Sequence, residues 1–199
     1  MGIAYLDGRT PAIVVARGVC GLMRVAAYAF QRGHIREIWQ WDNAGAPPSY
    51  WGQGAGTLHA ADLDGDGRDE VVLGSAVLDE EGIPLWTTGL DSPAHVYIGD
   101  IDPARPGLEI YYGNRGALRR DAMCLVEAAS GKVLWGHDQA TTDIAGAGLC
   151  ADLLPAKPGW ECYSGEREDL NGRWLRDCAG NVLARSDIGG VSPGALFWD

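Results

Sequence analysis

The sequence predicts an all-β chain built from about four β-propeller blades, and three observations support this fold class. The 199 residues include 29 glycines and 10 prolines, and 46% of the residues are apolar, which suits many short strands joined by tight turns. A pattern of strand, acidic turn and strand recurs along the chain, each time followed by a turn glycine and an apolar strand. The apolar positions show no 3.6-residue period, which argues against helical repeats of similar length.

The repeat defines each expected unit in order. The acidic-turn pattern occupies residues 61–74, 99–113 and 151–165, with a shortened first copy at residues 5–15. In the second motif, Gly33 comes first, and the last three glycines, Gly82, Gly131 and Gly180, are 49 positions apart in both steps. Residues 76–79 and 124–127 precede two of these glycines and read as the first strand of a hairpin. A repeat of about 40–50 residues with four strands has the size of a propeller blade.

We therefore expect a single propeller segment over residues 1–199, with blades near 1–45, 56–90, 94–137 and 145–186 and the start of another at 189–199. The alternative is a two-sheet sandwich, which would not normally repeat one turn chemistry at near-constant spacing. An open array of four blades would leave edges and faces bare, so we expect the missing blades of a longer chain to accompany this one. Trp39, Trp86 and Trp135 recur at the hairpins and are expected to pack between blades.

The charge narrows the possible partners. A formal net charge of −11 and a pI near 4.7 repel nucleic-acid phosphates and anionic membrane surfaces, and they attract divalent cations. No run of 18 apolar residues is present, and residues 1–7 lack the basic and apolar regions of a signal peptide. We expect no nucleic acid and no membrane among the partners.

The five cysteines contain no CxxC pair, so a structural zinc site is not expected. One interpretation is that they are buried free thiols that pack as small hydrophobic side chains. The other is a bridge between Cys150 and Cys162, because a hairpin that joins their two strands could place them opposite each other.

The first acidic turn has the spacing of a calcium site. Carboxylates recur at Asp62, Asp64, Asp66 and Glu70, and Gly67 permits a sharp turn between them. A hard cation takes six or more oxygens at about 2.3–2.6 Å, which these side chains and the Arg68 carbonyl could supply. The alternative is a solvated acidic loop, in which the carboxylates would repel one another without a cation.

The later copies of the turn are progressively less acidic. The second copy retains Asp100, Asp102 and Glu109, but residues 103–106 replace the third acid, and we treat it as a further calcium site. The third copy retains only Asp152 and Glu161, so it is expected to keep the turn without the ion.

Several segments in a fixed order resemble the family-eleven rhamnogalacturonan lyases of bacteria. They are residues 5–11, 52–54, 62–70, 76–79, 88–90, 99–103, 105–109 and 131–136, and they run through most of the chain. The resemblance implies an eight-bladed propeller with several calcium ions, secreted to act on rhamnogalacturonan I, an acidic plant cell-wall polysaccharide. It also implies cleavage by β-elimination, which needs a cation on the uronate carboxylate, a base for the C5 hydrogen and help for the departing C4 oxygen.

The residues that the family pattern places in its active site are replaced here. That pattern has Asn-His after Gly-Gln-Gly, His-Gly-Asp after Thr-Gly-Leu, His-Glu after the Pro-Gly-Leu-Glu strand, and Arg within Gly-Arg-Gly. This chain has Ala55-Gly56, Ser92-Pro93-Ala94, Asn114-Arg115 and Ala147 at those places. His59 and His95 lie near them and are candidate catalytic residues, with a packed or surface histidine as the alternative.

Other side chains are candidates for contact with a sugar. Tyr50 and Trp51 follow a proline-containing segment where an exposed aromatic ring could stack on a sugar ring, and Arg115 could pair with a uronate carboxylate. The sequence thus supports a lyase with replaced ligands. The alternatives are a non-catalytic, calcium-stabilised propeller that binds an acidic polysaccharide or acts as a scaffold, and a calcium-stabilised adhesion repeat without sugar binding.

Overall fold

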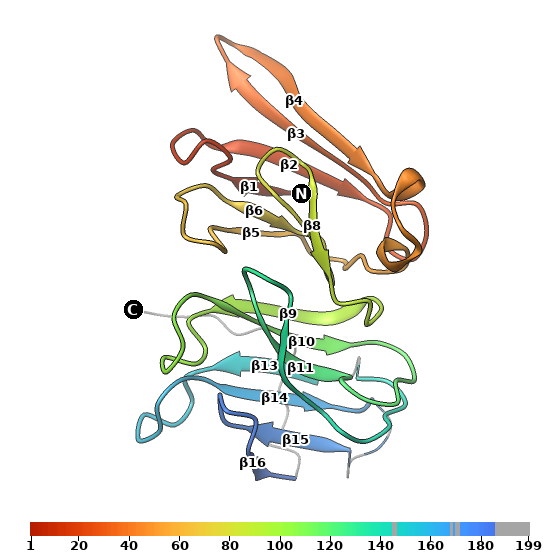
Figure 1. The fold of residues 1–199 in the computed structure, drawn as a ribbon, viewed down its shortest axis with the longest axis vertical. Helices are drawn as coiled ribbons and strands as arrows, with labels where there is room; N and C mark the ends of the chain where they lie inside the picture. Colours follow the sequence, from red (N-terminus) through yellow and green to blue (C-terminus); the bar gives the residue numbers. More distant parts are fainter. Residues whose placement is uncertain (145–146, 168, 170–171, 186–199) are drawn as a thin grey trace. The chain divides into compact units, whose positions relative to one another are not determined.

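The computed structural model describes residues 1–144, 147–167, 169 and 172–185, and within them every extended segment belongs to one of four antiparallel sheets (Figure 1). Each sheet has four strands that follow one another in chain order, as the repeat predicted. The all-β class is therefore confirmed. The predicted start of another unit at 189–199 lies outside the described residues.

The first half of the chain, Met1–Ser92, forms one compact unit of two sheets. Sheet I contains β1 (Gly2–Ala4), β2 (Ala12–Arg17), β3 (Arg24–Gln31) and β4 (His34–Asp42), and sheet II contains β5 (His59–Ala61), β6 (Glu70–Val72), β7 (Ala76–Leu78) and β8 (Pro84–Thr87). Two short 3-10 helices, η1 (Asn43–Gly45) and η2 (Pro48–Tyr50), connect them.

The second half, Pro93–Asp199, forms the other unit, again with two sheets. Sheet III contains β9 (Pro93–Gly99), β10 (Glu109–Asn114), β11 (Met123–Glu127) and β12 (Val133–Gly136), and sheet IV contains β13 (Ala147–Ala151), β14 (Glu161–Gly165), β15 (Arg173–Arg176) and β16 (Val182–Ala184). None of the described residues forms a helix that is long and apolar enough to cross a membrane.

Each unit buries its core between its two sheets. In the first unit, Val14, Val25 and Ala27 of sheet I pack with Val71 and Leu78 of sheet II. The second core joins sheets III and IV, and its members are Ile101, Tyr111, Ala122, Met123, Leu125, Ile144, Cys150, Cys162, Trp174 and Cys178. The alternation of side chains along each strand turns these residues to one face, so that neighbouring sheets share a core.

A tryptophan joins the sheets at the same place in both units. Trp39 donates its indole N–H to the Glu80 carbonyl at 2.8 Å, and Gly82 leaves room for the ring, since a Cβ there would lie 2.7 Å from it. In the second unit, Trp135 donates to the Cys178 carbonyl at 2.8 Å, and Gly180 lies against the ring. Both tryptophans therefore pack between neighbouring sheets.

Four of the five cysteines are buried in the structure as free thiols, as the first interpretation of the sequence expected. Cys20 is the exception and is exposed. Cys150 and Cys162 lie directly opposite each other on β13 and β14 without a bond between them.

Candidate calcium turns and substrate contacts

Each of the three acidic turns has its own buried glutamate, whose carboxylate accepts hydrogen bonds from backbone N–H groups of that turn. Glu161 Oε2 accepts the backbone N–H groups of Leu153 and Leu154 at 3.0 and 2.9 Å. In the other two turns, Glu109 Oε2 accepts from Ile101 and Asp102, each at 3.0 Å, and Glu70 Oε2 accepts from Leu63 at 2.6 Å. These glutamates are at most 2% exposed, so each one places a buried carboxylate where it satisfies backbone N–H groups of its turn.

The first turn also gathers its carboxylates. Asp62, Asp64 and Glu70 each offer an oxygen within 4.8 Å of the other two, and no other such group of three occurs among the described residues. The two oxygens of Asp62 accept the N–H groups of Gly65 and Gly67 at 2.7 and 2.9 Å. Gly67 has a φ of +89°, a conformation that favours glycine. The residues present therefore fit a hard divalent cation, which prefers carboxylate oxygens.

Asp66 is placed differently from the other predicted ligands. Its carboxylate accepts the side-chain Nε–H of Arg68 at 2.9 Å, and the Arg68 guanidinium also pairs with Glu80. The Asp66 side chain is thus paired with an arginine two residues away, and it is outside the group of three carboxylates.

The negative charge of this turn affects the pKa of Glu70. Burial, and then repulsion from Asp64, Asp66 and Glu80, raise the pKa of the Glu70 carboxyl to about 7, against the lowering effect of the Leu63 hydrogen bond. A nearby cation would favour the ionised form and counteract that repulsion.

The second turn does not gather its acids in this way. Asp102 accepts the side-chain Nε–H of Arg105 at 3.1 Å, so arginine from the inserted segment neutralises it. Glu109 keeps its bonds to the turn, and the pKa of its carboxyl is raised, mainly by burial. Asp100, Asp102 and Glu109 do not form a group like that of the first turn within the described residues.

The two candidate catalytic histidines occupy unlike environments. His95 is 8% exposed, its Nε2 lies 3.0 Å from Ser164 Oγ, and a Cβ added to Gly113 or Gly148 would clash with its ring. Burial lowers the pKa of His95 to about 4, which keeps the ring neutral near pH 7. His59 is partly buried beside Thr57 Oγ1 at 3.2 Å, and burial lowers its pKa too.

Sequence reasoning missed the groups that enclose His95. Ser164 Oγ also bonds to Tyr111 Oη at 2.5 Å, so the histidine of β9, the tyrosine of β10 and the serine of β14 form one buried chain. Ser164 lies 69 positions from His95 along the sequence, and no motif marks the pair.

The predicted sugar contacts are only partly at the surface. Trp51 is 43% exposed and Arg115 is exposed, whereas Tyr50 is buried and packs edge-on to Trp41 with ring centroids 6.2 Å apart. Ser92 and Asn114, at two of the places where the family pattern has catalytic residues, are buried, and Asn114 Nδ2 donates to the Asp121 carbonyl at 3.2 Å. The side chain of Ala147 is outside the described part of the chain.

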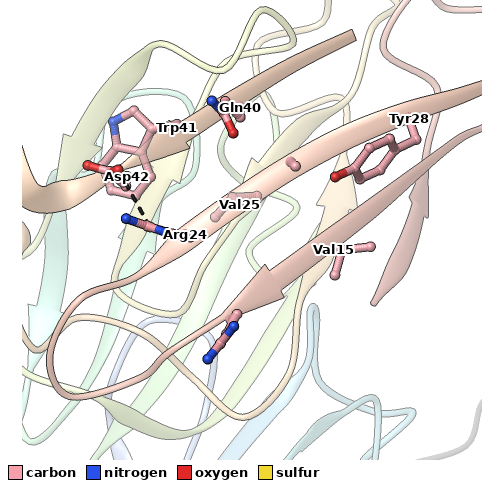
Figure 2. A pocket seen from close by; sticks show the side chains of 9 residues that line it. Val15, Arg24, Val25, Tyr28, Gln40, Trp41 and Asp42 are labelled. Carbon is pink, nitrogen blue, oxygen red and sulfur yellow. Dashed lines mark ion pairs between the residues drawn. The ribbon is translucent and has the colours of Figure 1, made fainter. Parts of the chain in front are cut away.

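One face of sheet I remains uncovered within its unit. Ile3, Val15, Phe30 and Ile35 are exposed there, although the opposite face of the same strands lies in the core. This face is hollowed by a cavity of about 610 Å³ (Figure 2). Figure 2 shows Arg24 paired with Asp42 at one end of the hollow, at 3.7 Å, and Val15 and Tyr28 at the other.

Comparison with known proteins gives one consistent family. The model of the C-terminal domain of rhamnogalacturonan lyase family 11 matches residues 1–199. The rhamnogalacturonan endolyase YesW of Bacillus subtilis (strain 168) is 37% identical over 164 residues, which cover 82% of this chain and 26% of that protein. The exolyase YesX of the same organism is 38% identical and covers 79% of this chain and 26% of its own length.

Solved structures agree with the sequence matches. The crystal structure of the exotype lyase YesX superposes with a TM-score of 0.86 at 34% identity, covering 93% of this chain and 31% of that one. The family-11 lyase of Bacillus licheniformis superposes with a TM-score of 0.84 at 33% identity, covering 93% of this chain and 30% of its own. The chain therefore spans about a quarter to a third of these relatives, and it belongs to rhamnogalacturonan lyase family 11.

Proposed function

We propose that this chain is a segment of a calcium-stabilised β-propeller that acts on rhamnogalacturonan I outside the cell. The observation that carries the proposal is the match of the family model to all 199 residues, together with relatives named as rhamnogalacturonan endolyase and exolyase. The four sheets have the strand number of propeller blades, and an acidic polymer of the plant cell wall requires a secreted protein.

Calcium is proposed for the Asp62–Glu70 turn. The support is the group formed by Asp62, Asp64 and Glu70, whose mutual repulsion a divalent cation would relieve. Such an ion supplies charge neutralisation to the turn, and its binding free energy would add to the free energy of unfolding. The second turn offers a cation fewer free carboxylate oxygens, because Asp102 is already paired with Arg105.

Further blades are proposed to cover the bare face of sheet I. Ile3, Phe30 and Ile35 are 56%, 64% and 67% exposed, which is unusual for one face of a sheet whose other face is core. The relatives are three to four times as long as the matched region, so they contain chain that could supply such sheets.

The lyase reaction needs a base for the C5 hydrogen, and the chain's own histidines bear on this step. His95 is enclosed and bonded to Ser164, so a sugar cannot reach it without opening the packing of sheets III and IV. His59 is less enclosed and stays as the candidate base within this chain. Trp51, in the same unit, and Arg115, in the other unit, are each a separate candidate for contact with a uronate.

A second function, binding without catalysis, is favoured by the environment of the replaced positions. Ser92 and Asn114 are buried, and the positions of the family's catalytic histidines carry no ionisable side chain that faces solvent except Arg115. A protein with this arrangement would retain the fold and the binding of the polysaccharide but would not catalyse its cleavage by β-elimination.

The test is an ultraviolet assay for the unsaturated uronate released from rhamnogalacturonan I, performed on the complete gene product with calcium and with chelator. Calcium-dependent product supports the lyase, and a His59→Ala variant then shows whether this residue is the base. A folded protein that is retained on the polysaccharide without releasing product supports the binding function. Absence of both product and retention contradicts the proposal.

A further inference from the structure

The cysteines of sheet IV are placed as a pair. Cys150 on β13 and Cys162 on β14 are direct partners in the antiparallel register, and their Sγ atoms are 3.4 Å apart. Both side chains are fully buried in the core between sheets III and IV. A disulfide has its sulfur atoms about 2.05 Å apart and joins Cβ atoms about 3.5–4.5 Å apart, so small side-chain rotations could close the bond.

The pair lies at the base of the third acidic turn. Residues 152–160 connect β13 to β14. Ala151 and Glu161 are the strand pair next to this connection, and Cys150 and Cys162 are the following pair. In the corresponding first turn, Asp62, Asp64 and Glu70 form the carboxylate group, whereas the third turn has Leu153 and Leu154 after its one aspartate. The third turn has therefore lost the ligands that a cation would need to hold its two strands together.

The neighbouring thiols do not compete for this pairing in the structure. Cys178 Sγ faces the Pro158 carbonyl at 3.3 Å and Asp102 Oδ1 at 3.8 Å. Cys124 lies on β11 of sheet III, where its register partners are Tyr112 and Gly136.

We propose that Cys150 and Cys162 form a disulfide, and that this bond joins β13 to β14 at the turn where the carboxylate group has been lost. The two thiols lose two protons and two electrons to a small-molecule disulfide such as oxidised glutathione, which is reduced to two thiols. One S–S bond forms within the protein and one breaks in the oxidant. The inference does not depend on lyase activity; it requires only the oxidising surroundings that the proposed secretion would provide.

The burial of the pair sets when the bond can form. Exchange proceeds through the thiolate, and burial together with the neighbouring Cys150 raises the pKa of the Cys162 thiol well above its usual value. An oxidant also has no path to two side chains with no exposed surface. The bond therefore forms while the chain folds, before sheets III and IV pack, and the folded dithiol resists oxidation.

The experiment counts thiols in denaturant after refolding the chain with reductant or with a reduced and oxidised glutathione mixture. All five thiols are expected after reducing refolding and three after oxidative refolding, with one peptide linkage between the segments of Cys150 and Cys162 by mass spectrometry. Oxidised glutathione added to the reduced, folded protein should reach only the exposed Cys20 and leave Cys150 and Cys162 without a linkage between them. Five thiols after oxidative refolding, or a linkage to another cysteine, would overturn the proposal.

Two variants make the count specific. Cys150→Ala should retain its four thiols under both conditions, whereas the control Cys124→Ala should fall from four to two. Because the count is made in denaturant, it does not require that either variant be stable. A Cys150→Ala protein that still loses two thiols would show that other cysteines pair.

Discussion

The first and third acidic turns share a buried glutamate that bonds to the backbone of the turn, and they differ in the acidic side chains that accompany it. Each has a buried glutamate that accepts backbone N–H groups of the turn, from Leu63 in the first and from Leu153 and Leu154 in the third. The first turn adds Asp62 and Asp64 to its glutamate, and the third has leucine where Asp64 would be. The glutamate therefore shapes the turn, and the aspartates are what a cation would require.

The largest expected effect is the loss of the glutamate from the third turn. Glu161→Ala removes the buried acceptor of two backbone N–H groups, and we expect it to lower the free energy of unfolding by about 3 kcal/mol. Glu70→Ala should cost less without calcium, because one amide loses its partner and the repulsion from Asp64 and Asp66 disappears. Urea unfolding of both variants measures the difference, with the exposed Glu81→Ala as control. Equal losses would contradict this account of the turns.

The next largest effect should be a calcium-dependent stabilisation that the first turn gives and the third does not. Free calcium at a hundredfold excess over its dissociation constant should raise the free energy of unfolding by about 3 kcal/mol through the first turn. Thermal unfolding with calcium and with chelator measures this. Asp64→Asn should abolish the difference, and the matched change Asp152→Asn in the third turn should preserve it.

A smaller effect should appear in the pH dependence without calcium. The folded-state pKa of Glu70 is raised, so its stabilising contribution is complete below the unfolded pKa near 4.5 and is lost as the pH rises through about 7. We expect a loss of about 2 kcal/mol, which allows for the screening by solvent of the repulsion from the exposed Asp64 and Asp66. The difference between wild type and Glu70→Gln in urea unfolding at pH 5 and pH 8 isolates this contribution from that of His95. Parallel curves would contradict it.

The smallest effect is a gain in the third turn. Glu161 Oε1 is buried and has no hydrogen-bond partner among the described residues, so it could serve as a ligand of a cation. Leu154→Asp places a carboxylate where the first turn has Asp64, and it should add a calcium-dependent stabilisation of about 1 kcal/mol. The control Leu153→Asp puts the charge one position away and should add none.

The sequence predicted the parts of this molecule that local chemistry determines. Turn glycines such as Gly67 and Gly82, with apolar strands on either side, were enough to predict four-stranded units, because their backbone conformation and spacing depend on near neighbours. The group of Asp62, Asp64 and Glu70 was predicted for the same reason, since its members lie in one turn.

The rest depends on contacts that spacing does not reveal. Glu70 was predicted as a cation ligand, and its hydrogen bond to Leu63 was missed. The presence of Glu161 in a turn that has leucine in place of the second aspartate was a signal that the glutamate has a second role. Tyr50 was predicted to face a sugar but is buried against Trp41. His95 is enclosed by Ser164, far away in the sequence, so its burial could not be read from its own segment.

The first turn should bind a divalent cation and the third should not, and calorimetric titration of the chain with calcium measures this difference. Binding should be lost in Asp64→Asn and unchanged in Asp152→Asn. Absence of binding to the wild-type chain, or equal losses in the two variants, would contradict it.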